Sequence, residues 1–449
     1  MLLERKTKER CTPYLLFVIF VAALSGFLFG YYTGIISGAL IFQTPAFQLS
    51  IIEQGMVVSF ILLGAILGAL IAGFLADRFG RKRTMMITAV IFVIGAIIIC
   101  LSDSLEMLLL GRLISGLGVG VVSVVTPLYL AEISPPHYRG TFVSGYQLAI
   151  TLGILGSFIV NYFFADSGNW RGMFGIGIFP ALLQGVSLFF VPESPAFLFG
   201  QGFDALAIKT LSRLRKDTAW RHQIEVMKGG ASSHKKGGWK ILFSSKLRFC
   251  VLIGVVLSIF QQITGINTVI YYSPKIFEMA GFTTASIAIL ATLGIGIINV
   301  FATLFSVWLL DRVGRRILLL IGSLGMACSL GSLSIAFFSQ SALIDQIALF
   351  SLMGYVVFFA IGLGPVTWVI LSEIYPLKIR GKAMTLATFA NWGCNYFVAL
   401  TFLDLIHWIG AHGVFLLYAL ASLASFWFIF RFIPETKGKS LEEIELKLQ

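Results

Sequence analysis

The sequence has few charged residues and few cysteines. Only 12% of its 449 residues are charged, whereas 57% are hydrophobic and the mean hydropathy is +0.91. A soluble protein of this length cannot cover so much apolar surface with so little charge. The five cysteines show no Cys-x-x-Cys spacing, so we expect them to be small apolar residues without a metal or disulfide role. The composition predicts a polytopic membrane protein.

Sequence motifs typical of enzymes are also missing. There is no glycine-rich phosphate loop, no metal-ligand spacing and no nucleophile–base constellation. We therefore expect no enzymatic activity, no cofactor and no metal ion. No Asn-x-Ser/Thr glycosylation acceptor occurs either, which favours a bacterial source.

Long apolar runs dominate what is present. Twelve runs are long enough to cross a bilayer, and they fall into two sets of six. We expect an all-α membrane protein with an N-terminal six-helix bundle (1–191), a cytoplasmic linker with amphipathic helices (192–246), a C-terminal six-helix bundle (247–433) and a cytoplasmic tail (434–449). The runs lie near 14–40, 51–76, 84–101, 108–130, 141–163, 171–191, 247–272, 283–310, 316–338, 345–371, 383–406 and 410–433.

The formal net charge of +12 reflects membrane topology. If the N-terminus is cytoplasmic, 33 − 3 = 30 of the Lys and Arg residues lie on the cytoplasmic side. The exceptions are Arg112, Arg171 and Lys275. This positive-inside asymmetry predicts a plasma (inner) membrane protein with both termini in the cytoplasm. It also argues against a nucleic-acid partner.

Charged motifs at the predicted cytoplasmic helix ends recur in both halves. The offsets between matching acids are 311 − 77 = 234, 373 − 132 = 241 and, for the Pro-Glu pairs, 434 − 192 = 242, which indicates duplication. Acid–arginine pairs that form in one conformation only would bias a two-state equilibrium; the alternative is that they are static anchors. The predicted cytoplasmic latch comprises Asp77, Arg78, Arg81, Glu132, Arg139, Glu193, Asp311, Arg312, Arg315, Glu373, Arg380 and Glu435.

A polar stretch interrupts the seventh run. It reads Gln261-Gln262-Ile263-Thr264-Gly265-Ile266-Asn267, with Thr268, Tyr271 and Tyr272 beyond it. On an ideal helix Gln261, Thr264, Thr268 and the tyrosines share one face, and unwinding at Gly265 could bring Gln262 onto it. Uncharged amides suit a neutral ligand rich in hydroxyl groups. The alternative is that they only join helices.

Two later runs add residues of the same kind. Pro365 predicts a break in the tenth run. Asn391 and Trp392 lie near the middle of the eleventh, and an indole face suits stacking on a sugar ring. Trp368 lies nearer a membrane boundary, where tryptophan is often an interfacial anchor.

These motifs together resemble the sugar porter family of the major facilitator superfamily over essentially the whole chain. The Asp-Arg-x-Gly-Arg motif indicates the superfamily, whereas Gln-Gln-x-x-Gly-Ile-Asn, Gly-Pro-Val-Thr-Trp, Pro-Glu-Ser and Pro-Glu-Thr-Lys-Gly are typical of sugar porters. The resemblance implies two bundles around a central cavity, transport of a monosaccharide by alternating access, and action as a monomer. It implies an outer gate of Tyr271 and Tyr272. The sugar contacts that it implies are Phe29, Gln147, Gln261, Gln262, Asn267, Asn299, Trp368, Asn391 and Trp392.

One departure from the family pattern concerns energy coupling. Proton symporters that resemble this chain carry Asp after Phe-Gly-Tyr in the first span, and here Tyr32 stands there. Tyrosine, with a pKa of about 10, stays protonated near neutral pH. Arg112 then lacks an acidic partner and should bond backbone or neutral groups. We therefore expect facilitated diffusion. The alternatives are a sugar/proton symporter that uses another carboxylate, a polyol (inositol) transporter, and a sugar sensor that does not transport.

Overall fold

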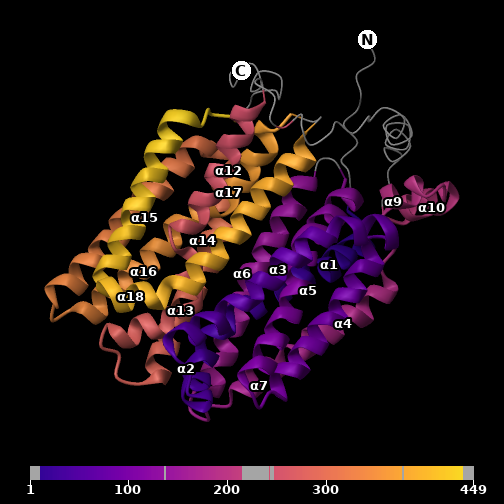
Figure 1. Cartoon of the computed structure of the whole chain (residues 1–449). Helices are drawn as coiled ribbons and strands as arrows, with labels where there is room; N and C mark the ends of the chain where they lie inside the picture. The colour runs from indigo at the N-terminus through magenta and orange to yellow at the C-terminus, as the bar shows by residue number, and fades with distance from the viewer. Residues whose placement is uncertain (1–10, 136–137, 215–241, 243–246, 377–378, 438–449) are drawn as a thin grey trace.

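The computed structural model describes residues 11–135, 138–214, 242, 247–376 and 379–437, and the side chains of Arg139 and Asp311 are not among the parts described (Figure 1). The described helices form two groups that lie side by side. The N-terminal group contains α1 (Pro13–Gly34), α2 (Ile36–Phe47), α3 (Ile51–Phe79), α4 (Arg81–Cys100), α5 (Leu105–Ile133), α6 (Arg139–Ala165), α7 (Trp170–Ile176), α8 (Ile178–Ser187) and the 3₁₀ turn η2 (Leu188–Phe190). The C-terminal group contains α12 (Arg248–Ile263), α13 (Ile266–Met279), α14 (Ala285–Val313), α15 (Arg315–Ser339), α16 (Ile344–Ile361), α17 (Leu363–Ile374) and α18 (Arg380–Phe432).

Twelve segments cross the molecule, as the sequence predicts. Eleven helical stretches in the described residues are long and apolar enough to span a membrane. The last of them, α18, is 53 residues long and has a non-helical backbone at Gly410 (φ 72°), so it contains the eleventh and twelfth spans. The expected all-α membrane fold is confirmed.

The first span packs closely on the fifth along a stripe of small residues. Gly26, Gly30, Gly34 and Gly38 recur every four residues and so share one face of α1 and α2. A Cβ at Gly30 would lie 1.9 Å from the carbonyl oxygen of Ile150 on α6. Only glycine permits this approach of the two backbones, which is a packing device common in membrane helices.

Two spans of the C-terminal bundle are broken near their middle. Between α12 and α13, Gly265 takes a left-handed conformation (φ 90°). Between α16 and α17 the break falls at Gly362. The sequence predicted this break near Pro365, which lies three residues later. Pro365 lies instead in the first turn of α17, where its missing N–H costs no helical hydrogen bond. Both breaks lie inside the protein, where irregular backbone is tolerated.

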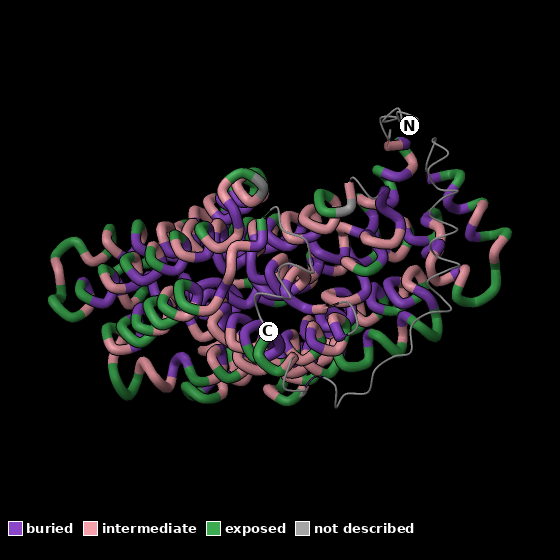
Figure 2. The backbone as a smooth tube through the Cα atoms, turned by 90° about the horizontal axis from the view of Figure 1, so that it is seen from above, coloured by how far each residue is buried: buried purple, intermediate pink, exposed green. Residues whose placement is uncertain are grey.

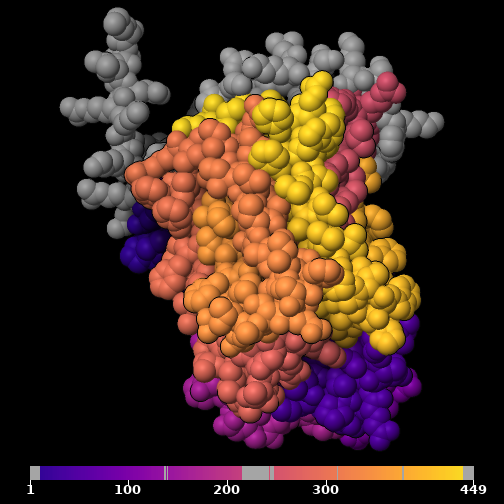
Figure 3. Space-filling model, turned by 90° about the vertical axis from the view of Figure 1, so that its left-hand side faces the viewer, coloured from indigo at the N-terminus to yellow at the C-terminus, as the bar shows by residue number. Residues whose placement is uncertain are grey.

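The two bundles meet along α3 with α18, α6 with α14, and α2 with α13. Seen from above, buried residues occupy the middle of both bundles and exposed residues the rim (Figure 2). The rim carries large apolar side chains such as Phe163, Phe338 and Trp408, which suits contact with lipid. In Figure 3 the C-terminal bundle covers most of the visible face, and the N-terminal bundle emerges at the end opposite the chain termini. We call this end, with the loops at 48–50 and 280–284, the outer end.

After η2 the chain forms two short helices, α9 (Pro195–Gly200) and α10 (Asp204–Leu214). They lie at the inner end of the N-terminal bundle and project from its side (Figure 1). Within the linker predicted at 192–246, amphipathic helix is thus present as far as Leu214. Residues 215–241 and 243–246 of this linker, and residues 438–449 of the predicted tail, lie outside the described residues.

Candidate functional site

Four side-chain amides form one hydrogen-bonded network in the C-terminal bundle. The Asn267 Nδ2 atom donates to Gln262 Oε1 (2.7 Å), and Gln262 Nε2 donates to Asn391 Oδ1 (3.0 Å). Asn391 Nδ2 in turn donates to Gln261 Oε1 (2.7 Å) and to the Ser258 carbonyl (3.0 Å). The break at Gly265 makes this possible, because it changes the helical register between Gln262 and Asn267. Three of these amides are buried, and Asn267, the end member, is half-buried.

The network is fixed to the second broken span. Gln261 Nε2 donates to the carbonyl oxygens of Leu363 (2.8 Å) and Gly364 (3.0 Å), directly after the break at Gly362. The amides of α12 are therefore held in place by the backbone of α17. Such orientation leaves the remaining donors and acceptors at the Asn267 end in a defined arrangement for a ligand.

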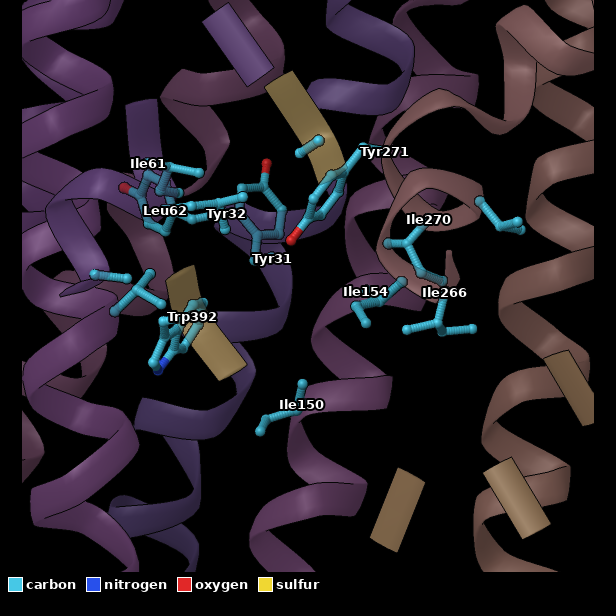
Figure 4. Packing of buried hydrophobic residues seen from close by; sticks show 14 of the residues in the cluster. Tyr31, Tyr32, Ile61, Leu62, Ile150, Ile154, Ile266, Ile270, Tyr271 and Trp392 are labelled. Carbon is cyan, nitrogen blue, oxygen red and sulfur yellow. The ribbon is translucent and has the colours of Figure 1, made fainter. Parts of the chain in front are cut away.

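Aromatic residues from the two bundles meet beside the network. The ring centroids of Phe29 on α1 and Trp392 on α18 lie 5.7 Å apart, with 33° between the planes. Trp392 directly follows the network residue Asn391 in the chain. Figure 4 shows Trp392 among apolar side chains from α1, α6 and α13 that belong to one buried cluster. Polar amides and flat rings thus lie together where the bundles meet.

The two tyrosines of the predicted outer gate are buried in α13. The Tyr272 hydroxyl donates to the Ala399 carbonyl (2.8 Å), and the Tyr271 hydroxyl accepts from Asn395 Nδ2 (3.3 Å). In Figure 4 the phenol of Tyr271 is turned toward the tyrosines of α1. A cavity of about 100 Å³ adjoins them on the outer side, lined by Ser37, Leu40, Ile41, Thr44, Tyr271, Tyr272, Lys275 and Glu278.

Polar contacts close the outer end of the seam. Lys275 on α13 donates to Gln54 on α3, and the Ser286 hydroxyl on α14 donates to Asp166 Oδ1 after α6 (2.7 Å). Both join one bundle to the other. The sequence analysis missed these contacts, although Lys275 was one of only three cations outside the cytoplasmic set.

Three predicted sugar contacts are not members of the hydrogen-bonded network. Asn299 on α14 is 8% exposed, whereas Gln147 on α6 and Trp368 on α17 are half-buried. Within the described part of the chain, none of the network's hydrogen bonds involves them. Their role in sugar binding stays a prediction.

The two threonines of the predicted polar stripe, Thr264 and Thr268, bond nearby backbone carbonyls. Both are fully buried, and their hydroxyls donate to the backbone carbonyls of Gln261 (3.4 Å) and Gly265 (2.7 Å). The Tyr355 hydroxyl donates to the Thr264 carbonyl (2.8 Å). The prediction assumed a continuous helix, whereas the structure has a break at Gly265, between the two threonines.

Tyr32 points into the N-terminal bundle. Its ring stacks on Phe92 at 4.9 Å, and its hydroxyl donates to the Phe92 carbonyl (3.1 Å). Arg112 is fully buried and donates to the backbone carbonyls of Val57 (2.9 Å), Val58 (3.1 Å) and Tyr32 (3.3 Å). Among the described residues no carboxylate pairs with Arg112. Backbone oxygens thus hold this buried charge, as expected where no acid is near.

Acid–arginine clusters occupy the inner end of each bundle. In the N-terminal bundle, Arg81 pairs with Glu132 (2.9 Å) and, more weakly, with Asp77 (3.6 Å). The Glu193 carboxylate accepts from the backbone N–H of Arg81 (2.9 Å), Lys82 (3.1 Å) and Ser194 (2.8 Å). The Ser194 hydroxyl donates to Glu132 and completes the cluster.

The C-terminal bundle repeats this arrangement. Arg315 pairs with Glu373 (3.3 Å), and the Thr436 hydroxyl donates to Glu373 (2.5 Å). Glu435 accepts four backbone N–H groups, from Arg315, Arg316, Thr436 and Lys437. Burial alone would raise the pKa of Glu435, but these four donors lower it below its usual value. Ser194 and Thr436, which the sequence analysis did not list, follow the glutamates of the two Pro-Glu motifs and could have been found from that repeat.

Other residues of the predicted latch are not brought into these clusters. Arg78 lies over the rings of Phe74 and Phe79 (both 5.8 Å), and Arg312 lies over Trp308 (3.9 Å). Arg380 donates to the Tyr375 carbonyl (3.1 Å). The side chains of Arg139 and Asp311 lie outside the described parts, so their place in the predicted latch stays a prediction.

Comparison with known proteins identifies the family. The family model described as "sugar (and other) transporter" matches residues 18–448. The chain belongs to this family. The sugar (and other) transporter family consists of membrane transporters, so the expectation that the chain is a transporter and not an enzyme is confirmed.

Named members of the family are similar to this chain over nearly their whole length. A D-xylose transporter of Levilactobacillus brevis is 41% identical, with 96% of this chain and 95% of the relative covered. A galactose-proton symporter of Escherichia coli (strain K12) is 40% identical, with 96% and 94% covered.

Solved structures agree with the fold. An inward-open structure of the xylose transporter from E. coli superposes with a TM-score of 0.84 at 35% identity and covers 97% of this chain and 100% of that one. A proton:xylose symporter of the major facilitator superfamily, bound to 6-bromo-6-deoxy-D-glucose, gives 0.82 at 35% identity, with 97% and 99% covered. The major facilitator fold expected from the motifs is confirmed.

Proposed function

We propose that this protein carries a monosaccharide, a hexose or a pentose, across the membrane by alternating access. One observation carries the proposal: an oriented network of uncharged amides lies beside a ring pair contributed by both bundles. Amides can donate to and accept from sugar hydroxyls, and the indole of Trp392 can stack on the C–H face of a sugar ring. The names of similar proteins, among them a D-xylose transporter and a galactose-proton symporter, support this class of substrate.

Transport follows from movement of one bundle against the other. The outer end is held by contacts that join α13 to α3 and α14 to α6, while the acid–arginine clusters at the inner end each lie within one bundle. A sugar bound beside Phe29 and Trp392 touches both bundles and can stabilise an occluded state. When the outer contacts break, the same site faces the other side.

We further propose that transport is facilitated diffusion. A proton-coupled carrier needs a group near the site that gains and loses a proton near neutral pH, and the phenol of Tyr32 donates to a backbone carbonyl instead. The substrate panel below distinguishes a polyol transporter from this proposal. A measurement of flux distinguishes a sensor, which would bind sugar without transporting it.

Proton symport is the second candidate. The E. coli galactose-proton symporter, at 40% identity, is named for it, and a second relative is named an arabinose-proton symporter. In this case a carboxylate elsewhere in the chain would take up the proton, because position 32 is a tyrosine. We place the protein in the inner membrane of a bacterium as a monomer with both termini cytoplasmic, in keeping with the asymmetry of its Lys and Arg residues.

A substrate panel in proteoliposomes tests the proposal. Labelled glucose, galactose, xylose, arabinose and inositol are offered one at a time, with empty liposomes as the control. We expect saturable uptake of at least one aldose. The unlabelled form of that sugar should compete with uptake of the labelled form. Saturable uptake of inositol alone would favour the polyol carrier, and binding without flux the sensor.

A further inference from the structure

A basic cavity lies beneath α10 at the inner boundary of the membrane-spanning region. Its volume is about 220 Å³, and it is lined by Pro192, Glu193, Leu198, Leu206, Lys209, Thr210 and Arg213. Four of these residues, Leu206, Lys209, Thr210 and Arg213, recur at helical spacing along one stripe of α10. The other wall is the chain segment that leaves the sixth span after η2. The cavity is thus formed where an amphipathic helix meets the end of a membrane span.

The charge of the cavity favours an anion. Lys209 and Arg213 are both exposed and stand four residues apart, a spacing at which like charges repel on a helix. Among the described residues neither of them pairs with a carboxylate. The carboxylate of Glu193, the one acid in the lining, accepts three backbone N–H groups at Oε1, so the lining carries two positive charges against one negative charge. An anion between Lys209 and Arg213 would relieve their repulsion.

The position of the cavity favours a lipid as the source of this anion. α10 projects from the side of the N-terminal bundle (Figure 1), so in a membrane it lies over the surrounding lipid headgroups. Phe203 and Leu206 are 60% and 50% exposed on or beside it, and Phe189 and Phe190 at the end of the sixth span are both 67% exposed. Apolar side chains thus surround a cationic cavity, which matches a phosphate group with acyl chains attached.

The cavity is also fixed to the bundle. The Arg213 guanidinium lies 4.6 Å from the ring centre of Tyr14, and the Tyr14 hydroxyl donates to the Phe190 carbonyl (3.0 Å). The Thr12 hydroxyl donates to the Leu214 carbonyl (3.0 Å) at the end of α10. A ligand in this cavity would contact both α10 and the segment that follows the sixth span.

We propose that this cavity binds the phosphate of an anionic phospholipid from the leaflet at the inner end. Lys209 and Arg213 contact the phosphate, the hydroxyl of Thr210 offers a further donor, and the acyl chains run along Phe189 and Phe190. The site lies outside the proposed sugar pathway, so the inference rests on the membrane-spanning fold and not on the choice of sugar.

Native mass spectrometry of the full-length protein tests the proposal, with phosphatidylglycerol or phosphatidylcholine added to the detergent solution. The variant is Lys209→Gln with Arg213→Gln, and the matched control is Arg248→Gln with Arg431→Gln, two exposed arginines at the inner end of the C-terminal bundle. Because each basic side chain near an anionic lipid contributes about fivefold in affinity, we expect the preference for phosphatidylglycerol to fall by about tenfold or more in the variant. The control should keep it.

Three outcomes would overturn the proposal: an equal loss in the control pair, no loss in the variant, or full displacement of the lipid by millimolar inorganic phosphate. The first would indicate general attraction to a basic surface, and the last a site for a soluble anion. Thermal unfolding in phosphatidylcholine checks that the variant is folded. Lys209→Gln alone, which keeps the contact between Arg213 and Tyr14, should show a smaller loss in the same direction.

Discussion

Lys275 on α13 donates a hydrogen bond to the side-chain oxygen of Gln54 on α3, and it thereby joins the two bundles at their outer end. Gln54 is itself held in place, because its Nε2 donates to the Leu49 carbonyl (3.1 Å). The two residues are 221 positions apart in the chain. Since the two residues belong to different bundles, we expect this contact to break when the outer end opens and so to affect the balance between outward-facing and inward-facing states.

Replacement of Lys275 by Met should favour opening at the outer end. A hydrogen bond from a charged donor contributes about 1.5 kcal/mol, which corresponds to roughly a tenfold change in the ratio of the two states. The measurement is the rate at which a membrane-impermeant maleimide labels a cysteine placed at Leu40, a cavity residue that is only 2% exposed here. The remote substitution Arg431→Met, at an exposed position of the inner end, serves as the control. Equal labelling rates in the wild-type, Lys275→Met and control backgrounds would show that this bond does not keep the outer end closed.

The amide network predicts a separation of binding from stability. Asn267 is the half-buried end member, so Asn267→Ala should weaken sugar binding by about 1–3 kcal/mol and leave the unfolding temperature nearly unchanged. Gln261 holds the backbone after the break at Gly362, so Gln261→Ala should also lower the unfolding temperature. Gln262→Ala should weaken binding strongly because it removes the link between Asn267 and Asn391.

Sugar titration and thermal unfolding of the same purified variants give both quantities. Wild-type affinity in Asn267→Ala and Gln262→Ala would mean that the network only joins helices.

The clusters at the inner end should control rates. Glu132→Gln and Glu373→Gln each remove an ion pair that lies within one bundle and away from the aromatic pair. We expect sugar exchange to slow several-fold while the sugar affinity changes little, because these residues act on the balance of states. Exchange rates in proteoliposomes and binding constants in detergent measure the two effects. A loss of affinity with an unchanged exchange rate would contradict this conformational role.

Tyr32 should decide whether a proton gradient drives accumulation. With an inward gradient imposed, wild-type protein should bring labelled sugar only to equilibrium, because tyrosine keeps its proton near neutral pH. Tyr32→Asp would place a titratable carboxyl beside Arg112, whose guanidinium reaches the backbone of this residue. We expect that variant to gain dependence on the gradient, and Tyr32→Asn, similar in size but not titratable, to remain independent of it. Accumulation by the wild type would overturn the prediction and favour symport.

The sequence was sufficient for much of the fold because length and hydropathy determine where a chain can cross a bilayer. It also raised unwinding at Gly265 as a way to bring Gln262 onto the polar face, and the structure has a left-handed residue there. An ideal helix could not give the relative placement of residues on the two sides of that break, such as Thr264 and Thr268.

Side-chain contacts between distant positions were beyond the reach of the sequence. Nothing near Gln54 indicates Lys275 as its partner, and the motif that contains Arg78 does not reveal that its side chain packs on phenylalanine rings. The network was predictable in composition, as Gln261, Gln262, Asn267 and Asn391 were all expected at the site. Its connectivity depends on two helix breaks whose angles only the three-dimensional structure provides.

Counterflow in proteoliposomes tests the central claim of sugar transport by alternating access most directly. Liposomes loaded with a high concentration of unlabelled substrate are diluted into a trace of the same labelled sugar, with no ion gradient present. The account predicts a transient internal excess of label over the external concentration, abolished in Gln262→Ala. A monotonic rise of label to equilibrium, with no transient excess at any loading concentration, would contradict a carrier that exposes one site to each side in turn.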